Sequence, residues 1–229
     1  MKNNNKTLKS GSSGSGAARG LPPKSTKLTE SESRDDPKTL RAKPQFFYPP
    51  GGILIWMIIV VELLTFTAGL GAYAWQRSLS PEAFSISQST LNITAGFINT
   101  LVLLSSGFFI AEAVYLLKKG RVRSSLHHIA ISISLGIAFL FIKGSEYSDK
   151  LSHGYDLTHD SFFTFYWLLT GFHFLHVLTG VVILSVLAVK IHKGIYNHEN
   201  YLDVETGAAF WHLCDLIWLM LYPALYLIK

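Results

Sequence analysis

The sequence contains little cysteine, little charge and, over its first 46 residues, almost no large apolar side chain. Its single cysteine, Cys214, lies inside an apolar run, so no intrachain disulfide can form. Only 15% of the 229 residues are charged, while 49% are hydrophobic. That balance lies at the apolar end of the range for globular chains. With one cysteine, the chain cannot have a fold held together by its own disulfides.

The first 46 residues carry the net positive charge of the chain. They contain ten Lys or Arg and four Asp or Glu, whereas the remainder contains ten basic and eleven acidic residues. This segment is rich in Ser, Gly and Lys, has no hydrophobic period and lacks the apolar stretch of a secretory signal. We predict a disordered basic tail over residues 1–46, followed by one domain over residues 47–229. Because the positive charge belongs to the tail, a nucleic-acid partner is not expected.

Long apolar runs dominate the chain from Ile53 onward. Each run is close to or longer than the roughly 20 residues that a helix needs to cross the hydrocarbon core of a bilayer. No run alternates with the period of a strand over a useful length. The sequence therefore predicts an all-α, polytopic membrane bundle of five transmembrane helices, at about 53–76, 93–117, 126–147, 162–189 and 207–228.

Basic residues are distributed unevenly between the two predicted sides of the membrane. Lys and Arg favour cytoplasmic loops. One side carries the basic tail and the six loop residues Lys118, Lys119, Arg121, Arg123, Lys190 and Lys193, and the other carries Arg77, Lys150 and Lys229. This bias predicts a cytoplasmic N-terminus and a C-terminus on the outer, periplasmic side.

Several ionisable or polar side chains fall inside the predicted spans. An ionisable group at mid-bilayer costs roughly 2.5–3.5 kcal/mol, so each is expected to have a partner or a function. His173 and His176 share one helix face, as do His212 and Asp215. We predict that these four residues form a buried polar network of hydrogen bonds between the fourth and fifth spans. Asn99 is expected to make a further polar packing contact, and Glu62, in the first span, either packs or faces lipid.

A metal site, haem ligation and a proton path stay open as alternatives for the histidines. A di-iron bundle needs Glu-x-x-His pairs, which the sequence lacks, and no Cys-x-x-Cys-His haem attachment occurs. Lys143 and Glu146 are predicted to form a local ion pair or to extend toward the membrane surface. The four glycines expected to let helices approach closely are Gly69, Gly71, Gly171 and Gly180.

Taken together, five segments resemble subunit III of the haem–copper respiratory oxidases, the cytochrome c oxidase subunit III family. They are "VELLTF" around Glu62, "NTLVLLSSG" beginning at Asn99, "GSEYSD" around Glu146, "TGFHFLHVLTG" and "FWHLCDLIWLMLY". They occur in the family's order over about residues 50–229. The long form of the family has seven helices, and this chain matches the last five.

The resemblance implies a non-catalytic subunit of a terminal oxidase, which reduces O2 to water in aerobic respiratory electron transport and pumps protons. This chain would bind no haem or copper, because both belong to the catalytic subunit I of the complex. Its partners would be subunit I, subunit II and lipids, including a bound phospholipid, in the inner (cell) membrane. It would support proton uptake and the stability of the catalytic subunit, with Glu62 on the lipid side. The candidate proton-exchanging surface groups are His192, His198, Glu199 and Asp203.

Two other functions stay open at this stage. An accessory subunit of a nitric oxide reductase belongs to a related branch and would look similar in sequence. A self-contained membrane haem or metal enzyme would instead use His173, His176, His212 and Asp215 as ligands.

Overall fold

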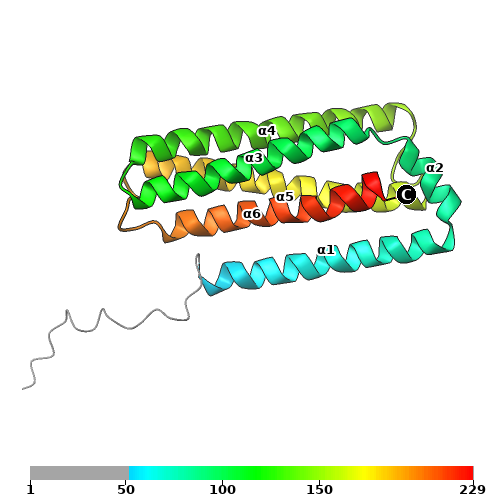
Figure 1. Cartoon of the computed structure of the whole chain (residues 1–229), viewed down its shortest axis with the longest axis horizontal. Coiled ribbons are helices and arrows are strands. Elements are labelled where there is room, and N and C mark those ends of the chain that lie inside the picture. The colour runs from blue at the N-terminus through cyan, green and yellow to red at the C-terminus, as the bar shows by residue number, and fades with distance from the viewer. Residues whose placement is uncertain (1–51, 229) are drawn as a thin grey trace, which may run out of the picture. The chain divides into compact units, whose positions relative to one another are not determined.

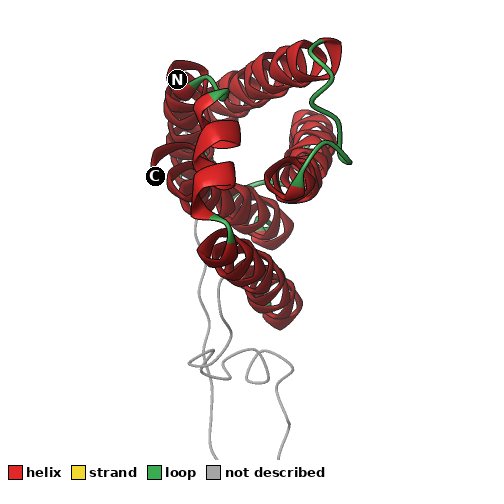
Figure 2. Cartoon of the chain, turned by 90° about the vertical axis from the view of Figure 1, so that its right-hand side faces the viewer, coloured by secondary structure: helices red, strands yellow, loops and turns green. Residues whose placement is uncertain are grey.

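A computed structural model describes residues 52–228 of the chain. The predicted disorder of residues 1–46 lies outside these residues. Within them, Figure 2 shows only helices and connecting loops. The helices are α1 (Ile53–Leu79), α2 (Pro81–Ser89), α3 (Ile93–Lys118), α4 (Val122–Ser152), α5 (Ser161–His192) and α6 (Leu202–Tyr222), and α6 continues into a π-helical turn, Pro223–Leu227.

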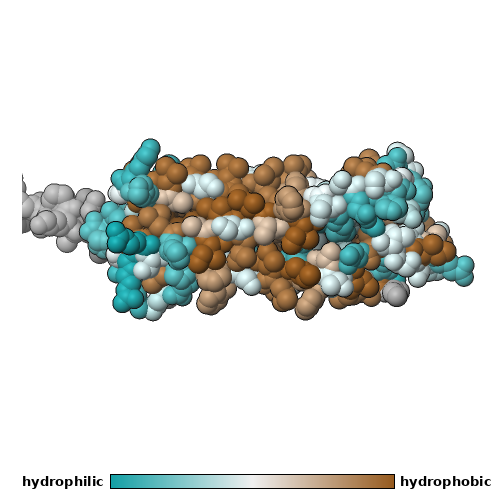
Figure 3. All heavy atoms as spheres, turned by 90° about the horizontal axis from the view of Figure 1, so that it is seen from above, coloured by the Kyte–Doolittle hydropathy of each residue, from teal (hydrophilic) through white to brown (hydrophobic). Residues whose placement is uncertain are grey.

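The five predicted spans are confirmed as helices that are long and apolar enough to cross a membrane. They correspond to α1, α3, α4, α5 and α6, and most extend beyond the predicted bounds by one to five residues. Figure 3 shows apolar side chains across the middle of one face of the molecule, with hydrophilic residues gathered toward both ends. The short helix α2 was not predicted, because nine residues of mixed polarity give no spanning signal.

Four of the long helices form an antiparallel bundle. α3 packs on α4, α4 on α5, α5 on α6 and α6 back on α3, which closes a ring (Figure 1). α1 lies outside this ring along α5 and α6, and it buries only Ile55, Phe66 and Tyr73. We call the end of the bundle where α1 begins the N-terminal end, and the end that holds α2 and Ile228 the C-terminal end.

Local sequence signals fix the ends of α3 and α5. The side chains of Asn92 and Asp160 accept hydrogen bonds from backbone N–H groups three residues later, at 3.0 and 2.7 Å, and so cap the two helices. Gly120 and Gly194 follow the same helices with φ near 74°, a left-handed conformation that glycine adopts without a steric penalty. The chain therefore reverses within a few residues and returns as an antiparallel neighbour.

A buried tryptophan holds the centre of the bundle together. Trp211 of α6 lies against Gly136 of α4 and Gly180 of α5, where an added Cβ atom would come within 2.6 and 2.7 Å of the indole ring. The indole N–H donates to the hydroxyl of Ser106 at 3.1 Å, and that oxygen lies 2.9 Å from the hydroxyl of Ser132. Trp211 thus contacts the three other helices of the ring.

The predicted role of four glycines is only half correct. An added Cβ atom at Gly180 would meet Trp211, and one at Gly69 would lie 2.7 Å from the side chain of Leu169, so close approach is confirmed at both. At Gly71 and Gly171 nothing lies within 4 Å of that position, and the prediction is wrong there. Sequence shows that a glycine lies in a span, but the rotation of the helix decides whether it faces a neighbour.

Candidate functional site

The polar side chains inside the bundle pair differently from the predicted network. His212 Nδ1 lies 3.2 Å from Asp215 Oδ2 on its own helix, and neither residue bonds to a histidine of α5. The pair faces α3, where an added Cβ atom at Gly107 would collide with the Asp215 carboxylate. The predicted hydrogen bonds between the fourth and fifth spans are therefore wrong. The i, i+3 spacing gives a shared face but not the direction in which that face turns.

His173 is fully buried among aromatic rings. Its imidazole stacks on Trp218 with ring centroids 5.3 Å apart, and Phe139 and Phe66 approach it edge-on at 5.8 and 6.5 Å. Neither ring nitrogen has a hydrogen-bond partner within residues 52–228. The side chain amide of Asn99 is buried and unpartnered in the same way, so its predicted polar contact is also not formed there. His173 packs as an aromatic residue would.

We expect His173→Phe to leave the protein as stable as the original or more stable. The substitution keeps a ring of similar shape and removes a buried polar group that makes no hydrogen bond. Cys214 is the single cysteine and is fully buried, so its reaction with a maleimide dye during heating in mild detergent reports opening of the bundle. A melting temperature lowered by more than a few degrees would show that the imidazole nitrogens are bonded in the native protein.

His176 connects the bundle to α1. Its Nε2 lies 3.3 Å from Glu62 Oε2, while its Nδ1 lies 2.9 Å from the carbonyl oxygen of Phe172. Nδ1 must donate to that carbonyl, so Nε2 of a neutral imidazole would present a lone pair to the carboxylate. The contact is attractive only when the two groups share an additional proton. Glu62, with 22% of its side chain exposed, is thus turned toward a neighbouring helix as well as toward the surface.

We expect His176→Leu to loosen α1 selectively, because α1 buries few residues and this contact is its main polar link to α5. Hydrogen–deuterium exchange in detergent should rise in α1 and stay unchanged in α3 and α4. Glu62→Gln is the matched control, since an amide N–H can donate to Nε2 and keep the contact. Equal exchange in α1 for the His176→Leu and unmodified proteins would contradict this role.

A second polar cluster lies near the C-terminal end of the bundle. Lys143 is 1% exposed, and its ammonium group donates to Glu146 Oε2 at 3.2 Å and to the hydroxyls of Tyr166 and Tyr226 at 3.1 and 2.5 Å. The two tyrosine hydroxyls donate in turn to Glu146 Oε1 at 2.9 and 2.7 Å. The cluster ties α4 to α5 and to the π-helical turn.

The predicted ion pair between Lys143 and Glu146 is confirmed, and the alternative that they extend to the membrane surface is wrong. The tyrosines were missed, although a lysine and a glutamate three residues apart in an apolar run are a signal that buried donors must lie nearby. The sequence did not reveal which residues supply these donors, because Tyr166 and Tyr226 lie 23 and 83 residues from Lys143 along the chain.

The four candidate surface groups lie near the N-terminal end of the bundle, around the connection from α5 to α6. Asp203 accepts a hydrogen bond from the Tyr196 hydroxyl at 2.6 Å. His198 and Glu199 are exposed and lie 3.8 Å apart, and His192 is exposed at the end of α5. The structure brings them to one end without forming a closed site.

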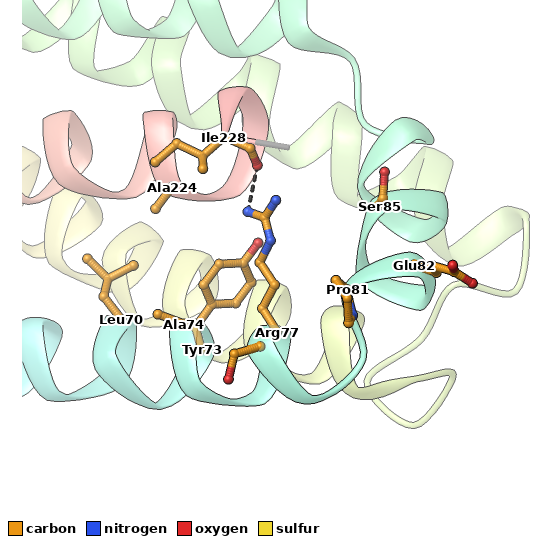
Figure 4. Close-up of a pocket in the computed structure, with 10 residues that line it drawn as sticks. Leu70, Tyr73, Ala74, Arg77, Pro81, Glu82, Ser85, Ala224 and Ile228 are labelled. Carbon is orange, nitrogen blue, oxygen red and sulfur yellow. Dashed lines mark hydrogen bonds between the residues drawn. The ribbon is translucent and has the colours of Figure 1, made fainter.

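A groove of about 820 Å³ opens at the C-terminal end between α1, α2 and the π-helical turn. Figure 4 shows Arg77 on its wall, with Nη1 donating to the carbonyl oxygen of Ile228 at 2.6 Å. The Tyr73 hydroxyl points toward the same guanidinium group. The lining also includes Ser78, Glu82 and Ser85, and the rest is mainly apolar, so the groove combines one cation and one carboxylate with a largely apolar surface.

The histidines do not converge on a common centre. Within residues 52–228 no group of three or more His, Cys, Asp or Glu side chains is placed to hold a metal ion. His212 faces α3, His176 faces α1, and His173 is enclosed by aromatic rings. The fold and these contacts define the class: a polytopic helical membrane protein whose intramembrane histidines lie at separate places in the bundle.

Comparison with known proteins identifies the family. The family model described as cytochrome c oxidase subunit III matches residues 51–229, which include all five spans. The chain belongs to the cytochrome c oxidase subunit III family.

Three relatives, each named cytochrome c oxidase subunit 3, illustrate the range of similarity. The protein of Thermostichus vulcanus is 32% identical over 178 residues, which cover 77% of this chain and 86% of the relative. Those of Gadus morhua and Emericella nidulans are 33% and 35% identical over 129 residues, or 56% of this chain. These alignments span about half of the two longer relatives, at 48% and 47% of their lengths.

Proposed function

We propose that this chain is the non-catalytic subunit III of a haem–copper terminal oxidase, which reduces O2 to water in aerobic respiration and couples the reaction to proton pumping. The family match over all five spans carries the proposal. The relatives described above all carry the name of an oxidase subunit, which favours an oxidase over a nitric oxide reductase.

In this proposal, haem and copper belong to the catalytic subunit I, which together with subunit II forms the partner of this chain. The environment of His173 supports this division, because Trp218, Phe139 and Phe66 already occupy the space around its imidazole. A self-contained haem or metal enzyme would need histidines directed at one centre, and these side chains face different helices. The chain's own contribution is to keep the catalytic subunit stable and supplied with protons.

We place the protein in the inner (cell) membrane with its N-terminus in the cytoplasm. The α3–α4 and α5–α6 connections lie at the same end of the bundle as the start of α1 (Figure 1). These connections carry Lys119, Arg121 and Lys193, and the adjoining ends of α3 and α4 carry Lys118 and Arg123. The excess of Lys and Arg at this end supports a cytoplasmic assignment for it.

His192, His198, Glu199 and Asp203 lie at that cytoplasmic end and are the groups proposed to exchange protons with water. Histidine is the side chain suited to exchanging protons near neutral pH, and neighbouring carboxylates add negative charge that attracts protons to the same surface. Replacing all four by Gln or Asn is expected to slow oxygen consumption at alkaline pH, where protons are scarce. His153→Gln at the opposite end, which is exposed as well, should have no effect. Equal pH profiles for the two proteins would exclude the proton-exchange role.

The groove beside Arg77 is the proposed site for a phospholipid. Arg77 would bind the phosphate and the apolar lining would hold the acyl chains. Native mass spectrometry of the purified complex, with and without Arg77→Gln, should show loss of one retained phospholipid. Retention of the same lipid by the variant would contradict this assignment.

The proposed function is tested by affinity purification of the full chain from its own membranes in mild detergent. Subunits I and II, identified by mass spectrometry, should accompany it in constant ratio together with haem absorption and oxygen-reducing activity. Recovery of the chain with a nitric oxide-reducing partner, or without any haem-bearing subunit, would overturn the proposal.

A further inference from the structure

One ionisable pair reaches the surface of the bundle at mid-membrane. His212 lies in the middle of α6, and 46% of its side chain is exposed. Its Nδ1 donates to Asp215, so the neutral imidazole presents Nε2 outward as an acceptor. The other carboxylate oxygen, Asp215 Oδ1, is buried and has no hydrogen-bond partner within residues 52–228. The pair is thus incompletely satisfied by the described chain.

Three hydroxyl groups on the outer faces of the spans are satisfied by their own helices. The hydroxyls of Thr65, Ser134 and Thr179 each donate to the carbonyl oxygen four residues earlier, at 2.8–2.9 Å. Such bonds allow a polar side chain to face hydrocarbon at low cost. The outward nitrogen of His212 has no equivalent bond, which sets this face apart from the lipid-facing ones.

The exposed side of α3, the helix that the pair faces, carries an acidic group of its own. Glu112 of α3 is half-buried and makes no hydrogen bond or ion pair within the described residues. It lies one helical turn from Phe108, which is exposed beside Gly107, the residue whose missing side chain makes room for Asp215. Acceptors therefore occur on both α3 and α6, framed by the exposed apolar residues Leu104, Phe108, Leu216 and Leu219. We call this surface the α3–α6 face.

We propose that the α3–α6 face is the docking surface for a transmembrane helix of the catalytic subunit, and that this helix presents hydrogen-bond donors or a basic side chain to His212 and Glu112. The proposal rests on the proposed function for the identity of the partner. Charge complementarity selects the occupant: lipid acyl chains offer no donor at this depth, and a second copy of the chain would set acceptors against acceptors.

Photo-crosslinking in the intact complex tests the proposal. A photoreactive amino acid replaces Leu216 on the α3–α6 face or, as a matched control, Leu175 on α5, which is similarly exposed. Irradiation should join the chain to the catalytic subunit from position 216 and not from position 175. An adduct from position 175 alone, an adduct between two copies of the chain, or no protein adduct from position 216 would overturn it.

A binding measurement supplies the second arm. His212→Phe should weaken retention of the catalytic subunit during detergent titration by about threefold to thirtyfold, the range for one interhelical hydrogen bond in a membrane. Thr179→Val should leave retention unchanged, and equal retention by both variants would contradict the proposal. If His212→Phe fails to fold, crosslinking from Leu216 decides alone. Failure of the proposed function would look different, since no haem-bearing subunit would then accompany even the unmodified chain.

Discussion

Replacing Lys143 by Met should destabilise the protein more than any other single change at a polar residue. The substitution leaves Glu146 buried without its cation, and breaking one side of a buried ion pair costs roughly 3–5 kcal/mol. It also removes a donor from the hydroxyls of Tyr166 and Tyr226, so the bonds of these hydroxyls to Glu146 are what still links α4 to α5 and to the π-helical turn in this cluster. At about 2–4 °C per kcal/mol for a chain of this size, Cys214 should become reactive at a temperature lowered by roughly 10 °C.

Two further variants separate the effect of charge from that of packing. Lys143→Met combined with Glu146→Gln should recover much of the loss, because no unpaired charge is buried and the Gln oxygen can still accept from the tyrosines. Asp149→Asn removes one member of an exposed pair with His153, and it should change the melting temperature little. If the Lys143→Met protein had the same melting temperature as the original protein, Glu146 would have to be bonded to another partner or protonated.

Gly180→Val should produce the second large effect, by forcing α5 away from α6. The Cβ atom alone would come within 2.7 Å of the Trp211 ring, which is fully buried and has α4 on its other side. Overpacking of this kind costs about 1–3 kcal/mol, and displacement of a buried tryptophan adds to that. We expect a lower melting temperature by Cys214 reactivity and a weaker association with the catalytic subunit.

Gly171→Val is the matched control for this substitution. It makes the same change in the same helix, at a position where nothing lies within 4 Å of the added Cβ atom. The two variants should differ clearly in melting temperature. Similar melting of both would mean that α5 does not approach Trp211 as closely as the structure shows.

The spans were predictable because the bilayer imposes a length and an apolar composition that can be read along the chain. Pairings between helices were not, because they depend on the rotation of each helix about its axis. His212 and Asp215 share a face by spacing, yet that face turns to α3 rather than to the histidines of α5. His176 instead contacts Glu62 of α1, a carboxylate for which the sequence suggested no partner.

The burial of the ion pair between Lys143 and Glu146 is a second feature that could not be predicted from the sequence. Lys143 and Glu146 were recognisable as a pair from their spacing, but their depth was not. What keeps them in the interior is a pair of tyrosine hydroxyls from α5 and from the π-helical turn. The turn itself follows Tyr222, where Pro223 interrupts the regular helix, and it carries Tyr226 inward.

The central claim is that the intramembrane histidines of this chain serve packing and assembly, while the redox centres belong to the partner subunit. Its most direct test separates the purified complex into subunits and measures haem, copper and iron per polypeptide. We predict that haem and metals remain with the catalytic subunit, and that the isolated chain shows no visible absorption and no more metal than a protein-free blank. Stoichiometric haem or metal on the isolated chain, lost on replacing His173, His176 or His212, would contradict the claim.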